Sequence, residues 1–213
     1  MGKSPAIPAA VVRRLSLYLR HLEAVNRENC STVSSRQLGA SVNTSDAQVR
    51  KDLAYFGQFG QAGVGYGVDD LIQSIRQILG TDRTWNVALI GAGNLGQALI
   101  SYRGFDRKGF CLVAVFDADL EKVGKLADGE RRIRVEPMSA LAKTVRQKKI
   151  DLAILAVPAE VAQAVADQAV EAGVKGLLNF APASLRLPED VVLRAVDLSV
   201  ALEELSFRLS GSS

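Results

Sequence analysis

The stretch NVALIGAGNLGQAL (residues 86–99) decides the fold of the larger part of this chain. Its first five residues form an apolar run typical of a buried strand, and the run leads directly into Gly91-Ala92-Gly93-Asn94-Leu95-Gly96. The residues that follow favour a helix. A GxGxxG string carries little information alone, but between a strand and a helix it is typical of a dinucleotide-binding βαβ unit.

Each glycine of this turn has its own physical role. Gly91 allows the tight turn, Gly93 lets the backbone approach a pyrophosphate, and Gly96 lets the helix pack closely on the strand. The N–H groups at the start of the helix then face the phosphates. We therefore expect cofactor contacts from the whole turn, namely Gly91, Ala92, Gly93, Asn94, Leu95 and Gly96. An ordinary glycine-rich turn remains an alternative, as does coenzyme A, because such a cradle recognises only phosphate.

The identity of the dinucleotide is suggested by the next strand. The apolar run 111–116 ends at Asp117, about 20 residues beyond the last glycine, where a carboxylate accepts hydrogen bonds from the adenosine ribose. A carboxylate at that place repels a 2′-phosphate, so we predict NAD(H) as the cofactor instead of NADP(H). The expected cofactor site also includes Phe116 and, at the end of a later strand, Ala156, Val157 and Pro158.

The rest of this region alternates strands and helices. Further strands are expected at 131–135, 151–157 and 176–180, and helices near 139–148 and 160–172. Near-continuous apolar strands separated by helices predict a parallel sheet covered on both faces. An amphipathic helix, 197–209, closes the chain. The predicted fold class is therefore α/β, with a Rossmann-like domain.

The N-terminal part has a different pattern. Apolar residues at helical spacing predict a helix over 8–26, and serine caps predict two shorter helices over 34–42 and 45–56. The segment 57–68 has five glycines in twelve residues, and we expect it to form a tight β-hairpin. Three helices followed by such a hairpin predict a winged helix-turn-helix, and a further helix at 69–79 leads into a short linker.

This N-terminal third is the basic part of the chain. Residues 1–80 hold nine Lys and Arg against six Asp and Glu, and the remainder is electrically neutral. A basic domain favours a polyanionic partner, and the second helix of a helix-turn-helix enters the major groove of DNA. The expected contacts to double-stranded DNA are Thr44, Ser45, Gln48, Arg50 and Lys51, with Gln58 and Tyr66 from the wing. A merely solvated helix face is the alternative for Arg50 and Lys51.

Composition excludes several other classes. The two cysteines, Cys30 and Cys111, are far apart in sequence, which argues against a disulfide framework or a zinc site and predicts a reducing, cytoplasmic environment. No apolar run is long enough for a membrane span, and no signal peptide is evident. We expect neither a metal nor a membrane partner.

A catalytic acid or base is hard to find. A dehydrogenase needs a proton donor or acceptor near the nicotinamide, but the single histidine, His21, belongs to the first helix. This favours a protein that binds its cofactor as a ligand and is not an enzyme. Two alternatives remain: an NAD-dependent oxidoreductase with a basic interaction domain, and a coenzyme A-binding regulator.

Three stretches together resemble Rex, the family of bacterial redox-sensing repressors. They are VRKDLAYFGQFGQAGVGYGV (residues 49–68), IGAGNLGQAL (90–99) with Phe116-Asp117, and LNFAP (178–182). The resemblance implies a transcriptional repressor that binds a palindromic operator and is released by NADH. It also implies a homodimer with exchanged C-terminal helices, and hence domains at 1–80 and 81–195 and an exchanged helix at 196–213.

The resemblance further implies a switch network of three side chains, Arg20, Tyr102 and Asp197. Each has an ordinary structural alternative, since Tyr102 could simply pack at a helix end and Asp197 could simply cap a helix. In some members of the family an aromatic residue follows this aspartate and packs by the nicotinamide. In this chain the position is Leu198. That departure puts the strength of redox discrimination in question.

Overall fold

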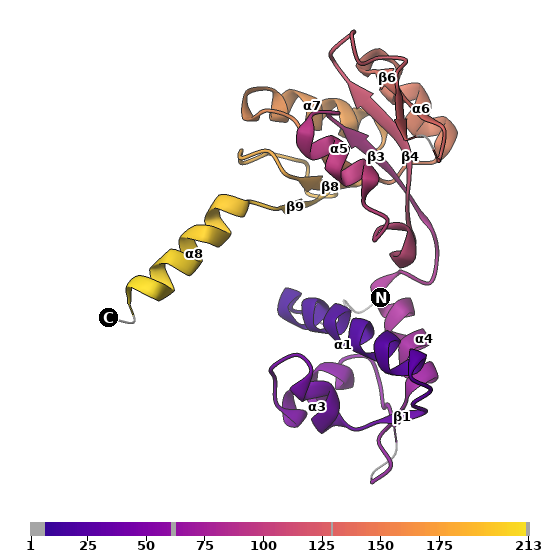
Figure 1. The fold of residues 1–213 in the computed structure, drawn as a ribbon, viewed down its shortest axis with the longest axis vertical. Coiled ribbons are helices and arrows are strands. Elements are labelled where there is room, and N and C mark those ends of the chain that lie inside the picture. Colours follow the sequence, from indigo (N-terminus) through magenta and orange to yellow (C-terminus); the bar gives the residue numbers. More distant parts are fainter. Residues whose placement is uncertain (1–6, 61–62, 129, 212–213) are drawn as a thin grey trace. The chain divides into compact units, whose positions relative to one another are not determined.

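The chain folds into two compact units, one ending at Arg83 and the other beginning at Thr84. The computed structural model describes residues 7–60, 63–128 and 130–211 (Figure 1). Each unit has its own hydrophobic core.

The N-terminal unit is a small helical domain with a two-stranded sheet. Its elements are α1 (Ala9–Arg27), β1 (Thr32–Val33), α2 (Ser35–Ala40), α3 (Asp46–Ala54), β2 (Tyr66–Gly67) and α4 (Val68–Leu79). Ser34 and Gln37 form a reciprocal capping box on α2, and Ser45 caps α3 by accepting from the backbone N–H of Gln48 at 3.1 Å. The helices expected from serine caps are therefore confirmed.

The turn between α2 and α3 depends on a glycine. A Cβ on Gly39 would lie 2.7 Å from the carbonyl oxygen of Thr44, so only glycine lets the two helices approach as they do. The two helices then share one core with α1 and α4, in which Leu15, Val49 and Ile75 are fully buried.

The glycine-rich segment differs from the expectation. Residues 66–67 do form a strand, but it pairs antiparallel with Thr32–Val33 and not with another part of 57–68. Gly57, Gly60 and Gly65 all have positive φ, a conformation that interrupts a strand. The expected hairpin within 57–68 is thus wrong for the described residues, and residues 61–62 lie outside them.

The second unit is a seven-stranded sheet with helices on both faces. In chain order it contains β3 (Trp85–Ile90), α5 (Asn94–Ser101), β4 (Phe110–Asp117), β5 (Leu126–Asp128), β6 (Ile133–Pro137), α6 (Leu141–Lys148), β7 (Leu152–Leu155), α7 (Ala159–Ala172), β8 (Gly176–Asn179), β9 (Val192–Ala195) and α8 (Leu198–Ser210), with short 3₁₀ turns at Asp106–Lys108 and Met138–Ala140. The strand order is β5-β6-β4-β3-β7-β8-β9, and every neighbouring pair is parallel except β5 with β6. The predicted parallel sheet is confirmed, while β5 and β9 were not predicted.

Alternation along β3 explains how both faces are covered. Ala88 and Ile90 pack with residues of α6 and α7, whereas Val87 and Leu89 pack with Ile100 of α5. Since β4 pairs with one edge of β3 and β7 with the other, the order in which strands are added to the sheet reverses at β3. The carboxyl end of β3 is therefore the topological switch point, where ligands bind in open α/β sheets.

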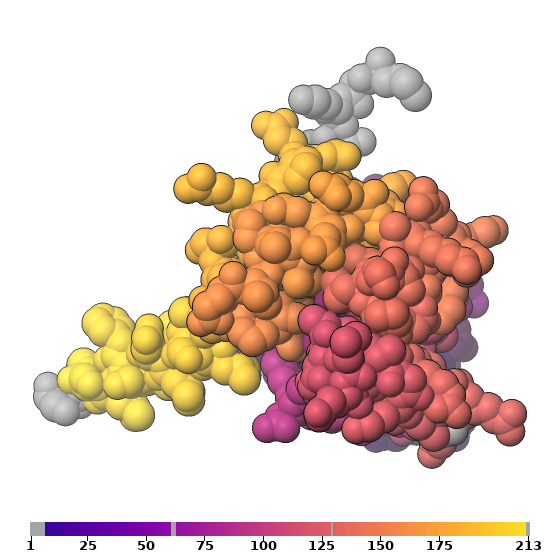
Figure 2. All heavy atoms as spheres, turned by 90° about the horizontal axis from the view of Figure 1, so that it is seen from above, coloured from indigo at the N-terminus to yellow at the C-terminus, as the bar shows by residue number. Residues whose placement is uncertain are grey.

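The C-terminal helix α8 has no buried residue in this single chain. Leu202, Phe207 and Leu209 are each at least two-thirds exposed. The helix projects from the rest of its unit (Figure 2). Among the described residues, no helix combines the length and the apolar character that crossing a membrane requires.

Candidate cofactor and DNA-binding sites

The glycine turn at the end of β3 is shaped by close backbone contacts. Gly91 has φ +102°, and its N–H donates to the carbonyl oxygen of Phe116 at 2.8 Å. A Cβ on Gly91 would overlap the carbonyl oxygen of Ala156, and a Cβ on Gly96 would overlap that of Gly91. Both positions therefore require glycine for packing alone, before any ligand is considered.

Gly93 differs from its two neighbours in the motif. A Cβ at this position would meet nothing within 4 Å, and Gly93 caps α5 without a side-chain hydrogen bond. The first N–H groups of a helix have no partner within it, and they favour an anion. Asn94 and Leu95 are exposed at the same helix start. Packing therefore does not explain why position 93 is glycine, whereas a phosphate approaching these amides closely would explain it.

Asp117, at the end of β4, is held close to this turn. Its Oδ2 accepts from the backbone N–H of Ala92 at 2.8 Å and from Lys122 Nζ at 3.1 Å, while its Oδ1 accepts from the N–H of Asp119 at 2.9 Å. Burial raises the pKa of Asp117, but these hydrogen bonds outweigh burial and leave its pKa below the usual value. The structure thus places an ionised carboxylate beside the glycine turn.

The remaining expected cofactor residues divide into two groups. Ala156, Val157 and Pro158 follow β7, which pairs with β3, and the N–H of Ala156 donates to the carbonyl oxygen of Ile90 at 2.8 Å. They therefore lie on the other side of the switch point. Phe116 is different, because its side chain is fully buried in the sheet core. Its side chain therefore packs in the core, and a contact of Phe116 with the cofactor stays a prediction.

The proposed recognition helix α3 presents basic side chains to solvent. Arg50 and Lys51 are exposed, as is Gln58 in the glycine-rich segment. Arg50 donates to Ser35 Oγ and to Asp46 Oδ2, both at 2.9 Å. A cavity of about 550 Å³ lies between α3 and the glycine-rich segment, and Arg50, Gln58 and Tyr66 are among its lining residues. The expected DNA-binding residues Arg50 and Gln58 thus share one hollow.

Tyr66 has a role that the sequence analysis did not give it. The residue is only 8% exposed and packs in the core of the N-terminal unit, and burial raises its pKa. A core position therefore accounts for its aromatic ring, and a contact of Tyr66 with DNA stays a prediction. Thr44 is half-buried and Ser45 exposed, both at the start of α3.

A buried ionic cluster fastens α3 to α1. The carboxylate of Asp52 is fully buried and accepts from Arg14 at 2.5 and 2.7 Å and from the Tyr18 hydroxyl at 2.9 Å. Burial raises the pKa of Asp52, but the hydrogen bonds from Arg14 and its neighbours lower it by more. The sequence held one signal of this cluster: Asp52 is a charged residue on the apolar face that Val49 and Leu53 define.

Gln48 also belongs to this cluster. Its Nε2 donates to Asp52 Oδ1 at 2.7 Å. Because an ionised carboxylate only accepts hydrogen bonds, the amide nitrogen must face Asp52. A bidentate contact to adenine needs both ends of the amide, so in this rotamer Gln48 cannot make the contact that its position suggests.

The three expected switch residues are all exposed. Arg20 lies on α1, Tyr102 is 57% exposed at the end of α5, and Asp197 lies at the start of α8. Asp197 accepts from the N–H groups of Ser199 at 2.8 Å and Val200 at 3.3 Å, so it is the N-cap of α8. Its participation in a switch network stays a prediction.

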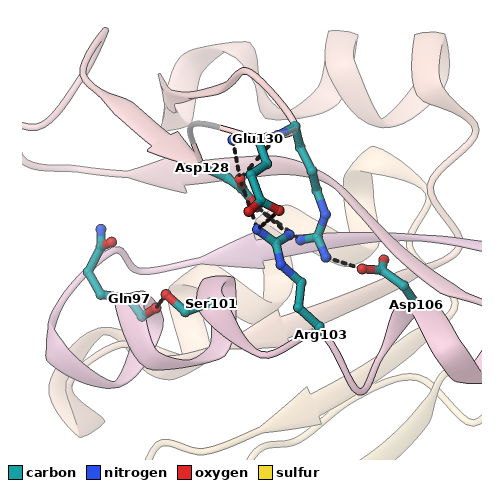
Figure 3. Close-up of polar contacts among 7 residues, drawn as sticks. Gln97, Ser101, Arg103, Asp106, Asp128 and Glu130 are labelled. Carbon is teal, nitrogen blue, oxygen red and sulfur yellow. Dashed lines mark hydrogen bonds and ion pairs between the residues drawn. The ribbon is translucent and has the colours of Figure 1, made fainter.

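The loop after Tyr102 is anchored at both ends to the β5–β6 turn. Arg103 donates to the buried carboxylate of Asp128 at 3.0 Å and pairs with Glu130, while Asp106 pairs with Arg131 (Figure 3). The Tyr102 ring stands edge-on to Phe105, with centroids 5.0 Å apart. The cluster therefore limits how far the backbone next to Tyr102 can move.

Within the described part of the chain, no group of three or more His, Cys, Asp and Glu side chains is arranged to hold a metal ion. His21 lies on α1, in the N-terminal unit.

Together these features define a class of protein: a helix-turn-helix unit joined to a Rossmann unit with a glycine cradle and an acidic residue at the second strand. Family models agree with this division. A model described as "CoA binding domain" matches residues 82–183, and one described as "Putative DNA-binding protein N-terminus" matches residues 6–54.

Relatives and solved structures place the chain more narrowly. It is 50% identical over 203 residues to the redox-sensing transcriptional repressor Rex of Carboxydothermus hydrogenoformans, covering 95% of this chain and 96% of the relative. It is likewise 50% identical over 209 residues to the Rex of Desulforamulus reducens, with 98% of each chain covered. The crystal structure of RSP in complex with β-NAD⁺ and operator DNA matches with a TM-score of 0.91 at 39% identity, covering 97% of this chain and 94% of RSP. The chain belongs to the Rex family.

Proposed function

We propose that this chain is a DNA-binding transcriptional repressor that senses the ratio of NADH to NAD⁺. The observation that carries the proposal is one chain holding both a glycine cradle with Asp117 beside it and a helix-turn-helix unit with exposed Arg50 and Lys51. One Rex-family repressor, RSP, was crystallised with β-NAD⁺ and operator DNA and also with β-NADH. A repressor of this kind works in the cytoplasm, where its DNA is.

The residues of the cradle suit this ligand. The amides at the start of α5 bind the pyrophosphate, and Asp117 accepts from the ribose hydroxyls. When bound, the nicotinamide supplies the oxidation state that is sensed. The same carboxylate argues against coenzyme A, because the phosphate on the ribose of coenzyme A would face a negative charge. We therefore retain NAD(H) over the coenzyme A alternative.

We further propose that the working unit is a homodimer that exchanges α8 between subunits. The support is the row of exposed apolar side chains on α8, which a single chain leaves in water. We propose domain limits of 1–80 for the DNA-binding domain, 81–195 for the cofactor domain and 196–213 for the exchanged helix, with the first limit three residues before the division at Arg83.

In this scheme the dimer has an open form that spans two operator half-sites and a closed form that does not. The cradle binds NADH better in the closed form, and Arg20, Tyr102 and Asp197 stabilise one of the two forms. A change from 1:99 to 99:1 requires about a 10⁴-fold preference for one form. No chemical step is needed, and NADH is not consumed.

The test is a mobility-shift titration with a palindromic operator. We expect the complex to dissociate as NADH rises and to persist with NAD⁺ alone. DNA that stays bound at saturating NADH contradicts the switch. Steady oxidation of NADH by the purified protein, followed by absorbance, would instead favour the oxidoreductase alternative.

A further inference from the structure

A lysine lies between two carboxylates beside the cradle. Lys122 Nζ is 3.1 Å from Asp117 Oδ2 and 3.7 Å from Asp119 Oδ2. Asp117 is mostly buried, with 12% of its side chain exposed, whereas Lys122 is 38% exposed and Asp119 45% exposed. Solvent and ligands can therefore reach the lysine, while the carboxylate that pairs with it is largely fixed.

The backbone holds this arrangement in place. The N–H of Asp119 donates to Asp117 Oδ1 and the N–H of Glu121 donates to Asp119 Oδ1, both at 2.9 Å. The N–H of Lys122 donates to the carbonyl oxygen of Asp119 at 3.0 Å. These bonds form two consecutive turns, which place the backbone of Lys122 within side-chain reach of Asp117.

We propose that Lys122 is a specificity-determining residue, a latent partner for a ribose 2′-phosphate that Asp117 and Asp119 keep neutralised. The inference rests on the proposed binding of NAD(H) in the cradle. Repulsion of a 2′-phosphate by Asp117 alone would not involve the lysine. In the proposed arrangement the choice between NADH and NADPH depends on the combined charge of Asp117, Asp119 and Lys122. One neutralising substitution then suffices to admit NADP(H).

The sign of the local charge gives the physical reason. Two carboxylates and one ammonium carry a net charge of −1, and a 2′-phosphate brings about two further negative charges to the same place. Like charges brought together at a binding site cost several kcal/mol, which corresponds to at least about a hundredfold loss of affinity. Without the Asp117 charge, the net charge of the three side chains becomes zero, and Lys122 is free to pair with the phosphate.

The experiment measures NADH and NADPH affinities of the full chain by calorimetry. The variants are Asp117→Asn, Asp119→Asn, Lys122→Met and the double variant Asp117→Asn with Lys122→Met. We expect Asp117→Asn to raise the NADPH affinity relative to NADH by about tenfold or more, and Asp119→Asn by about threefold, because Asp119 is farther away and more exposed. The double variant should lose most of the gain.

Lys125→Met is the matched control, because Lys125 is an exposed lysine on the same loop. Combined with Asp117→Asn, it should leave the gain unchanged. Asp119→Asn keeps the two hydrogen bonds of Asp117 to the backbone, so it tests the charge balance even where Asp117→Asn weakens the turn.

The outcomes separate this inference from the proposed function. A wild-type chain that binds NADH, with neither neutralising variant gaining affinity for NADPH, overturns the inference and leaves the repressor proposal intact. The inference is also overturned if Asp117→Asn and the double variant with Lys122→Met gain equal affinity for NADPH, because the lysine is then not the phosphate partner. A wild-type chain that binds neither dinucleotide overturns both.

Discussion

The cofactor cradle and the recognition helix are built in contrasting ways. The cradle is a backbone structure, in which Gly91 and Gly96 are excluded from bearing side chains by carbonyl oxygens of Ala156 and Gly91. The recognition helix α3 is held by side chains, through the buried carboxylate of Asp52 and its bonds to Arg14 and Tyr18. The cradle depends on the absence of Cβ atoms at two glycines, whereas the position of the recognition helix depends on the pairing of a buried charge.

This contrast predicts different responses to substitution. The backbone of the cradle tolerates no added atom at Gly91 and Gly96, where carbonyl oxygens are in contact, but its fold does not depend on the pairing of buried charges. A side-chain cluster tolerates changes of shape at its exposed rim, but loses stability when one partner is removed, because a buried charge is left unpaired. Substitutions at the two sites test that difference.

We expect Gly96→Ala to abolish NADH binding, with a loss of affinity of at least about a hundredfold, or about 2.7 kcal/mol. The added methyl group would overlap the carbonyl oxygen of Gly91, so β3 and α5 must separate. Calorimetric titration with NADH measures the loss, and thermal melting measures the accompanying destabilisation.

Gly93→Ala separates packing from binding. Its methyl group meets nothing within 4 Å in the free protein, so the melting temperature should hardly change while NADH affinity falls. Unchanged NADH affinity in this variant would mean that the phosphates do not approach Gly93.

Asp52→Asn should destabilise the N-terminal unit by about 2–3 kcal/mol. Loss of one partner of a fully buried pair costs about 3–5 kcal/mol, and we reduce that figure because Arg14 is 26% exposed. Hydrogen exchange followed by mass spectrometry should show loss of protection in α1 and α3, with operator affinity reduced. Protection in the Rossmann unit should be unchanged, and a uniform loss over both units would contradict the separation of the two sites.

Arg50→Ala should weaken operator binding by about tenfold. The slope of the logarithm of the binding constant against the logarithm of salt concentration should decrease in magnitude by about one, because one fewer counterion is released. Arg50 is exposed on α3, where it donates to Asp46 and Ser35. A mobility-shift series at several salt concentrations measures both quantities. Arg27→Ala, at the far end of α1, is the control and should change neither.

The smallest effect is a pH dependence of stability. The pKa of Asp52 is lowered in the folded chain, so its contribution to stability is complete above the unfolded value of about 3.9. That contribution is lost as the pH falls below this value and through the folded pKa. Chemical unfolding at pH values from about 7 to 3 should therefore show a steeper decline for the wild type than for Asp52→Asn. Parallel curves would mean that Asp52 titrates normally in the folded state.

Much of the fold was readable from the sequence because the signals are local. Serine caps set the starts of α2 and α3, and an apolar run followed by GxGxxG set β3, its turn and α5. The short strands β1, β5 and β9 were not predicted, because none of them has the continuous apolar run that marks β7 and β8. The hairpin expectation failed because β2 pairs with residues more than 30 positions earlier.

The residues of the candidate sites also divide into those with a local sequence signal and those that meet only on folding. The glycines and Asp117 were found because βαβ geometry repeats at fixed spacing. The helical spacing marks Asp52 as a charged residue on an apolar face, but no spacing rule could reveal its partner Arg14, which lies 38 positions earlier. Phe116 and Tyr66 were expected at ligand surfaces, but the structure buries both, because burial depends on which elements cover a residue.

The amino-acid sequence alone determined the two-part organisation, the glycine cradle and the preference for a dinucleotide, since each depends on the backbone of neighbouring residues. Only the tertiary structure decided which charges meet: Asp52 with Arg14, Asp128 with Arg103, and the orientation of the Gln48 amide. The physical reason is that backbone conformation follows from adjacent residues, whereas the pairing of buried charges depends on helices and strands that are distant in sequence and meet only on folding.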